Sequence, residues 1–159
     1  MRIFILLLLV LVFPAHAETL TGRVIGVTDG DTLKVLDAKR VVHKIRLAGI
    51  DAPEKKQEFG QKSKANLSAL THNQKATLQC QKEDRHRTKV CVVSVDGVDV
   101  GLEQLKSGLA WWYRKDANKQ SLHDRLNYGE AEFNARKQRI SLWQSDQPIP
   151  PWQWQEKNL

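Results

Sequence analysis

Four of the carboxylates between positions 29 and 54, together with Arg46, are residue types that suit metal and phosphate chemistry. Asp29 and Asp31 lie in the segment VTDGDTLKV, while Asp51 and Glu54 lie in GIDAPE. Carboxylates that are brought close together repel one another unless a cation or an arginine such as Arg46 compensates their charge. Ca²⁺ and Mg²⁺ prefer carboxylate, carbonyl and water oxygens. The sequence thus suggests a site for a hard divalent cation. Its candidate ligands are Asp31, Asp51 and a main-chain carbonyl near Ala52.

Other metal and carboxylate sites do not fit the spacing. An EF-hand loop that begins at Asp29 would have Lys34 where glycine belongs and Arg40 where the bidentate glutamate belongs. The histidines are scattered, and they form no zinc-binding spacing with the two cysteines. The Asp-Thr-Gly triplet of aspartic proteases does not occur.

Short β-branched segments, separated by turn residues, predict the strands that position these side chains. Asp29-Gly30 is typical of a two-residue hairpin turn, and Pro53 ends strand pairing. The predicted strands are 20–28, 32–36, 40–50, 76–80 and 89–95. The spacing of apolar residues predicts helices over about 59–72, 98–112 and 121–143. The third of these is indicated by Leu122, Leu126, Phe133 and Ile140.

Five strands and three helices, with one helix between the third and fourth strands, predict an α+β fold that is mainly β. We expect a five-stranded OB-type β-barrel. By alternation along its strand, Arg46 points to the face opposite Ile45 and Leu47. Strand pairing brings Asp31 to the same end of the barrel as Asp51.

Residues 1–17 have the pattern of a secretory signal peptide, in which a basic start, an apolar run and small residues precede Glu18. The run is short for a membrane span. We therefore expect cleavage after Ala17, a secreted or periplasmic protein, and no membrane association afterwards. The mature chain is predicted to be one OB-type domain, 18–145, followed by a Pro/Trp-rich tail, 146–159. We expect this tail to be irregular or only docked on the surface.

The charge and the cysteines give broader indications. The formal charge is +7, and basic exported proteins commonly meet nucleic acid, anionic lipid or acidic glycan. Cys80 and Cys91 would face one core if their strands form an antiparallel pair. A disulfide between them fits an oxidising compartment, and two buried thiols are the alternative.

The segments DGDTLKV and RLAGIDAPE, ten residues apart, resemble the thermonuclease (staphylococcal or micrococcal nuclease) family. The matching residues are Asp29, Gly30, Asp31, Thr32, Arg46, Asp51, Pro53 and Glu54. The resemblance extends over about 20–145, because DGVDVGLEQLKSGLAWWY and EAEFNARKQRISLW are similar to helical segments of that family.

This resemblance implies a Ca²⁺-dependent nuclease that cuts DNA and RNA, prefers single strands and leaves 3′-phosphate ends. By the same resemblance, Asp31 and Asp51 would bind Ca²⁺ together with the carbonyl of Ala52. Glu54 would orient or deprotonate the attacking water, and Arg46 would hold the phosphate through its guanidinium group. We expect the protein to be a monomer.

The second arginine of the family's site has no direct match. The family usually reads Asp-Arg/Lys-Tyr-Gly-Arg before its last strand, whereas this chain reads DRHRTKVCVV. An alignment without a gap places Thr88 at the arginine, and a one-residue deletion places Arg87 there. We predict Arg87 as the second catalytic arginine, with Arg85 as the next candidate.

Two non-enzymatic hypotheses compete with the nuclease. An OB-type barrel can bind single-stranded nucleic acid without cutting it, and this would give salt-sensitive binding with no metal-dependent product. A protein that binds anionic surfaces would bind heparin or anionic lipid equally well and would not need Arg46.

Overall fold

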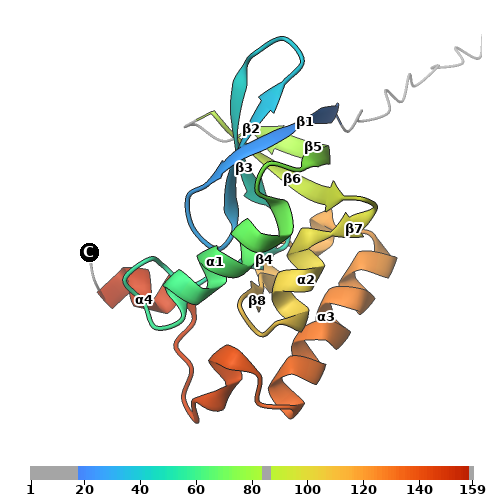
Figure 1. Cartoon of the computed structure of the whole chain (residues 1–159). Helices are drawn as coiled ribbons and strands as arrows, with labels where there is room; N and C mark the ends of the chain where they lie inside the picture. The colour runs from blue at the N-terminus through green and yellow to red at the C-terminus, as the bar shows by residue number, and fades with distance from the viewer. Residues whose placement is uncertain (1–17, 84–86, 158–159) are drawn as a thin grey trace, which may run out of the picture.

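The computed structural model describes residues 18–83 and 87–157. In these residues the chain forms a five-stranded mixed β-barrel with helices packed beside it (Figure 1), which confirms the predicted α+β, OB-type fold. The predicted signal peptide, residues 1–17, lies outside the described residues, as does Arg85.

The barrel is a curled sheet that closes on itself. Its antiparallel pairs are β1–β2, β2–β3, β1–β5 and β5–β6, and a parallel pairing of β3 with β6 closes it. The long strands are β1 (Glu18–Val27), β2 (Thr32–Asp37), β3 (Val42–Leu47), β5 (Lys75–Glu83) and β6 (Thr88–Val95). The short strands are β4 (Ile50–Asp51), β7 (Val98–Asp99) and β8 (Trp111–Trp112), of which β4 pairs with β8.

The helices gather below the barrel in Figure 1. They are α1 (Gly60–Thr71), α2 (Val100–Lys106), α3 (Leu122–Lys137) and α4 (Pro151–Lys157), with two 3₁₀ helices, η1 (Arg114–Lys119) and η2 (Ser141–Gln144). Asp99 caps α2 by accepting the N–H groups of Gly101 and Leu102. The hydroxyl of Tyr128 on α3 donates to the same carboxylate at 2.7 Å, so one side chain ties the two helices together.

The core follows from the alternation of apolar side chains along the strands. The fully buried strand residues in the barrel include Val24, Leu33, Val35, Ile45, Leu78 and Val93. A second apolar cluster lies at the helical side, where Trp111 and Trp143 pack with Ala135 and Leu142.

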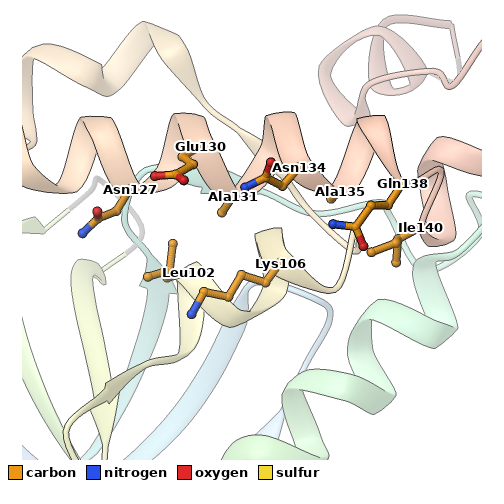
Figure 2. A pocket seen from close by; sticks show the side chains of 9 residues that line it. All are labelled: Leu102, Lys106, Asn127, Glu130, Ala131, Asn134, Ala135, Gln138 and Ile140. Carbon is orange, nitrogen blue, oxygen red and sulfur yellow. The ribbon is translucent and has the colours of Figure 1, made fainter.

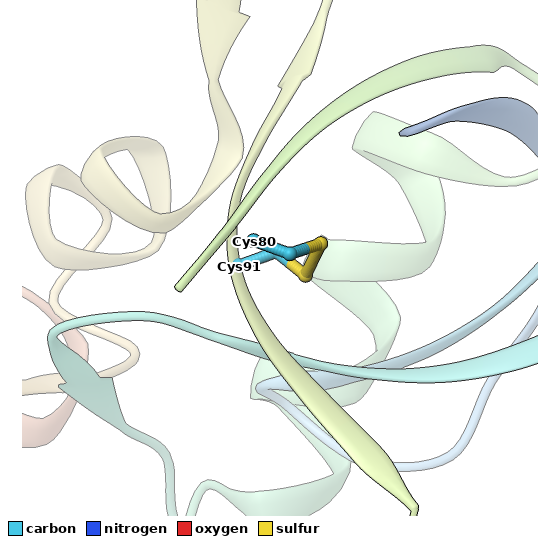
Figure 3. The surroundings of a disulfide bond; sticks show 2 residues. All are labelled: Cys80 and Cys91. Carbon is cyan, nitrogen blue, oxygen red and sulfur yellow. A yellow bond between two sulfur atoms is a disulfide. The ribbon is translucent and has the colours of Figure 1, made fainter. Parts of the chain in front are cut away.

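Cys80 and Cys91 form a disulfide (Figure 3), as predicted. They are directly opposite each other in the β5–β6 pair, and both are buried in the barrel core. Closing a loop of this length stabilises a fold by about 3 kcal/mol in the chain-entropy model.

The second predicted helix is shorter than we expected. α2 ends at Lys106, because Gly108 adopts a positive φ of 61° that turns the chain away. The segment Trp111–Trp112 is therefore strand β8, and the prediction of helix over 98–112 was wrong at its C-terminal end.

The chain after α3 also differs from the prediction. α3 ends at Lys137, followed by Arg139 with a φ of 53° and then by η2. The tail contains α4 (Pro151–Lys157), although we expected it to be irregular or only docked on the surface. Pro151 is the first residue of α4, a position that suits proline because the helix needs no N–H donor there.

Candidate active site

The turn between β1 and β2 positions Asp31. The N–H of Thr28 donates to the carbonyl of Thr32 at 2.8 Å, and the N–H of Asp31 donates to Asp29 Oδ1 at 3.2 Å. Gly30 is required between the two aspartates, because a Cβ there would lie 2.0 Å from the hydroxyl oxygen of Ser63 on α1. Asp29 thus stabilises the turn by an internal hydrogen bond, and Gly30 packs closely against α1.

Gln104, on α2, stabilises this turn by a hydrogen bond to its backbone. Its side chain is fully buried, and its amide Nε2 donates to the carbonyl of Gly30 at 2.6 Å. The same amide donates to the carbonyl and the hydroxyl of Ser63, each at 3.1 Å. Sequence reasoning missed Gln104, because a glutamine within a predicted amphipathic helix gives no signal of burial.

The Asp31 carboxylate is buried, with 6% of the residue exposed, and both of its oxygens accept a hydrogen bond. The hydroxyl of Thr32 donates to Oδ1 at 2.7 Å, and the N–H of Ala52 donates to Oδ2 at 3.0 Å. The second bond joins the β1–β2 turn to the segment after β4. The segments DGDTLKV and RLAGIDAPE are therefore joined by a hydrogen bond to Asp31.

Asp51 and Arg46 form an ion pair beside Asp31. Arg46 is paired with Thr32 in the β2–β3 register, and its guanidinium donates to Asp51 Oδ1 at 3.0 Å. Asp51 is 4% exposed, whereas the Arg46 side chain is 46% exposed. The arginine therefore has donors left to meet a ligand from solvent.

Burial and crowding change the proton affinities of these groups. Burial raises the pKa of Asp31 to about 7, with added repulsion from Asp29 and Asp51 and opposition from Arg46. Burial likewise raises the pKa of Asp51 to about 6, against the attraction of Arg46. Burial would lower the pKa of Arg46, but the carboxylates outweigh it, so the pKa rises. Arg46 thus does not fully compensate the cost of ionising both Asp31 and Asp51.

These side chains surround one cavity of about 170 Å³. Its lining residues are Asp29, Asp31, Thr32, Lys44, Arg46, Asp51, Ala52, Pro53, Glu54, Thr88 and Gln155. Glu54 lies on the loop between β4 and α1, and its N–H donates to Gln57 Oε1 at 3.1 Å. The structure therefore brings Asp31, Arg46, Asp51, Ala52 and Glu54 together around one space.

Arg87 lies apart from this group. It is an exposed bend residue with a φ of 57°, directly before β6, and it does not line the cavity. Its neighbour Thr88 does line the cavity, in parallel register with Lys44 of β3. The catalytic role of Arg87 stays a prediction, and the next candidate, Arg85, is outside the described residues.

Lys44 and Gln155 line the cavity but were not predicted. Lys44 lies two residues before Arg46 on β3, so strand alternation places both on one face and was the signal that could have found it. Gln155 comes from α4, which is distant in sequence, and no local pattern could have placed it at the site.

The described residues of the site supply part of the ligand set that a hard cation needs. In the described part of the chain, no group of three or more His, Cys, Asp or Glu side chains is close enough to hold a metal ion. The buried carboxylates of Asp31 and Asp51 are nonetheless oxygen ligands of the kind that Ca²⁺ prefers. Arg46 forms an ion pair with Asp51 and attracts Asp31 through its charge. A cation would relieve the remaining repulsion between the two carboxylates, and its other ligands would be carbonyl and water oxygens.

Other cavities differ in character. One of about 550 Å³ lies between α2 and α3 (Figure 2), and Leu102, Ala131 and neutral amides contribute much of its lining. Another, of about 360 Å³, adjoins the candidate site, since Arg46 and Asp51 line both. Among the described residues, no helix is long and apolar enough to span a bilayer.

Comparisons with known proteins show which family this chain resembles. The family described as "Staphylococcal nuclease homologue" matches residues 44–145. A Haemophilus influenzae protein named "Uncharacterized endonuclease" is 39% identical over 153 residues, which are 96% of this chain and 83% of that protein. An Escherichia coli protein of the same name is 35% identical over 153 residues, 96% of this chain and 95% of its own. "Micrococcal nuclease" of Shigella flexneri is 32% identical over 155 residues, 92% of this chain and 86% of its own.

Proposed function

Because this chain belongs to the staphylococcal nuclease family and is an endonuclease of that family, we propose that it is a Ca²⁺-dependent phosphodiesterase of DNA and RNA. The observation that carries the proposal is the single cavity that joins the carboxylates of Asp31 and Asp51 to Arg46 and Glu54. We further propose that it prefers unpaired strands, works as a monomer and leaves 3′-phosphate ends.

Each side chain has a role that its chemistry suits. Asp31 and Asp51, with the Ala52 carbonyl, would hold Ca²⁺, which supplies positive charge that stabilises the phosphate oxygens in the transition state. Arg46 binds a phosphate oxygen with the donors that Asp51 leaves free. Glu54 accepts a proton from the attacking water.

The proposed 3′-phosphate ends, which the family resemblance implies, require the following bond changes. The water oxygen forms a bond to phosphorus while the P–O5′ bond breaks. The 5′ oxygen leaves and takes up a proton from solvent, so the phosphate stays on the 3′ side. Arg87 would add a second guanidinium if its exposed bend turns toward bound substrate. Donors of this kind stabilise such transition states by about 3–4 kcal/mol each.

The location outside the cytoplasm is part of the proposal. The buried Cys80–Cys91 disulfide favours an oxidising compartment. The signal-peptide pattern in residues 1–17 supports the same location. We therefore propose that the mature enzyme is secreted or periplasmic.

The test is cleavage of labelled single-stranded DNA by residues 18–159 in Ca²⁺ and then in chelator. Arg46→Ala and Glu54→Gln should each lower kcat by about 10²-fold or more, because each removes a transition-state interaction. The matched controls are Arg125→Ala and Glu58→Gln, which change exposed residues that do not line the cavity. Metal-dependent cleavage that is lost only in the site variants is expected. Binding without any cleavage, or cleavage that ignores the chelator, would overturn the proposal.

A further inference from the structure

The C-terminal segment, residues 148–157, reaches the candidate site although it lies beyond residues 44–145 that match the family. Its helix, α4, lies beside the loop that leads into α1 (Figure 1). Gln155 lines both the cavity that holds the carboxylates and the adjoining cavity of about 360 Å³. The segment therefore forms part of the wall between these two spaces.

Two sets of contacts hold the segment in place. The side chain of Gln57 accepts the N–H of Glu54 through Oε1, and its Nε2 donates to the carbonyl of Ile149 at 2.7 Å. At the start of α4, the ring of Trp152 meets Trp111 and Tyr113 edge-to-face, with centroids 5.7 Å and 5.8 Å apart. The start of the segment is thus tied both to the Glu54 loop and to the aromatic cluster.

Near the end of α4, Gln155 contacts the carboxylate of Glu54, the proposed general base. The amide Nε2 of Gln155 donates to Glu54 Oε1 at 2.6 Å. Within the described residues this is the hydrogen bond that the Glu54 carboxylate accepts, so Oε2 is left to accept one from water. An amide does not titrate, and for this reason the contact does not alter the number of charges at the site.

Taking the proposed function as its basis, we propose that Gln155 is a positioning residue for Glu54. Glu54 lies on a loop, where a long side chain samples several rotamers unless another group fixes it. The bond from Gln155 holds one carboxylate oxygen, and this fixes the direction in which the other can accept the proton of the attacking water. Gln155 does not touch the reacting phosphate in this role and acts only through Glu54.

The test is Gln155→Met, which keeps the length of the side chain and removes its donor. Loss of orientation should lower kcat on single-stranded DNA by about tenfold, a part of the contribution of a general base, while KM changes by less than about twofold. Gln153→Met is the matched control, because Gln153 is an exposed glutamine on the same helix that does not line the cavity. Gln155 is exposed, so the thermal midpoints of both variants should equal that of the wild type.

A double-variant cycle separates positioning from any other effect. If Gln155 acts through Glu54, adding Gln155→Met to Glu54→Gln should cause no further loss of kcat. An equal tenfold loss in both backgrounds, a change in KM alone, or a rise in activity would overturn the proposal. Wild-type kinetics in Gln155→Met would overturn it as well, while the proposed nuclease function would stand. A wild type that does not cleave would overturn the proposed function, and the positioning role with it.

Discussion

Asp31 and Asp51 are two buried carboxylates beside one arginine, Arg46. Their raised pKa values should make the stability of the protein depend on pH even without substrate. Burial raises the pKa of Asp31 to about 7 and that of Asp51 to about 6, from an ordinary value of 3.8. Between about pH 4 and pH 7 the native protein therefore holds more protons than the unfolded chain. Asp31 and Asp51 therefore lower the free energy of unfolding of the metal-free protein as the pH rises through this window.

We expect the thermal midpoint in chelator to fall between pH 5 and pH 8, and to fall less in Asp31→Asn, which removes one of the two titrating groups. Ca²⁺ binds ionised carboxylates, so its addition should raise the midpoint of the wild type more at pH 8 than at pH 5. Calorimetry across the pH range provides both measurements. The same pH dependence in wild type and Asp31→Asn would contradict the charge balance described above.

At this scale, the sequence predicted the side chains whose types are unusual for their positions. Arg46 in an apolar strand and the closely spaced aspartates are such cases, and the structure places them around one cavity. Gln155 could not be predicted, because it is brought to the cavity by a contact between segments far apart in the chain. The position of Arg87 relative to the cavity depends on the path of a surface loop, and sequence alone does not determine that path.

At the scale of elements, α2 supports the turn that carries Asp31. Gln104 is buried and donates to the carbonyl of Gly30, while its Oε1 accepts from Asn66 at 2.6 Å. Gln104→Leu would leave the buried carbonyl of Gly30 and the buried Ser63 without these hydrogen bonds, at a cost of about 1–3 kcal/mol each.

We therefore expect urea unfolding to show a loss of about 2–4 kcal/mol for Gln104→Leu, and Ca²⁺ to bind more weakly because the turn loosens. Gln79→Leu, an exposed position on β5, is the control and should have nearly wild-type stability. A stability of Gln104→Leu equal to that of this control would show that the amide does not hold the turn.

α3 shows why helical spacing predicted an element but not its packing. Leu122, Leu126 and Phe133 indicated the helix, yet these residues are 65%, 63% and 63% exposed. The buried face instead carries Tyr128, Ala131, Glu132 and Ala135. Glu132 is buried because Arg114 and the N–H of Trp112 satisfy its oxygens, and such a tertiary contact overrides the apolar pattern.

At the scale of the whole molecule, the barrel depends on a single closing pair of strands. β3 and β6 close the sheet in parallel register, and Cys91 lies opposite Leu47 in that pair. Cys91 is also bonded to Cys80 of β5, so the disulfide lies where three strands meet. A covalent bond at this point lowers the conformational entropy of the unfolded chain between β5 and β6.

Cys80→Ser with Cys91→Ser should therefore lower the free energy of unfolding by about 3 kcal/mol. For a chain of this size, that corresponds to a fall of about 6–12 °C in the thermal midpoint. The reductant dithiothreitol should lower the midpoint of the wild type similarly and leave the double variant unchanged, which separates loss of the bond from any effect of serine itself. Neither cysteine lines the cavity, so cleavage by the double variant well below its midpoint should match the wild type. An unchanged midpoint, or a loss of cleavage in the folded variant, would contradict a role confined to barrel closure.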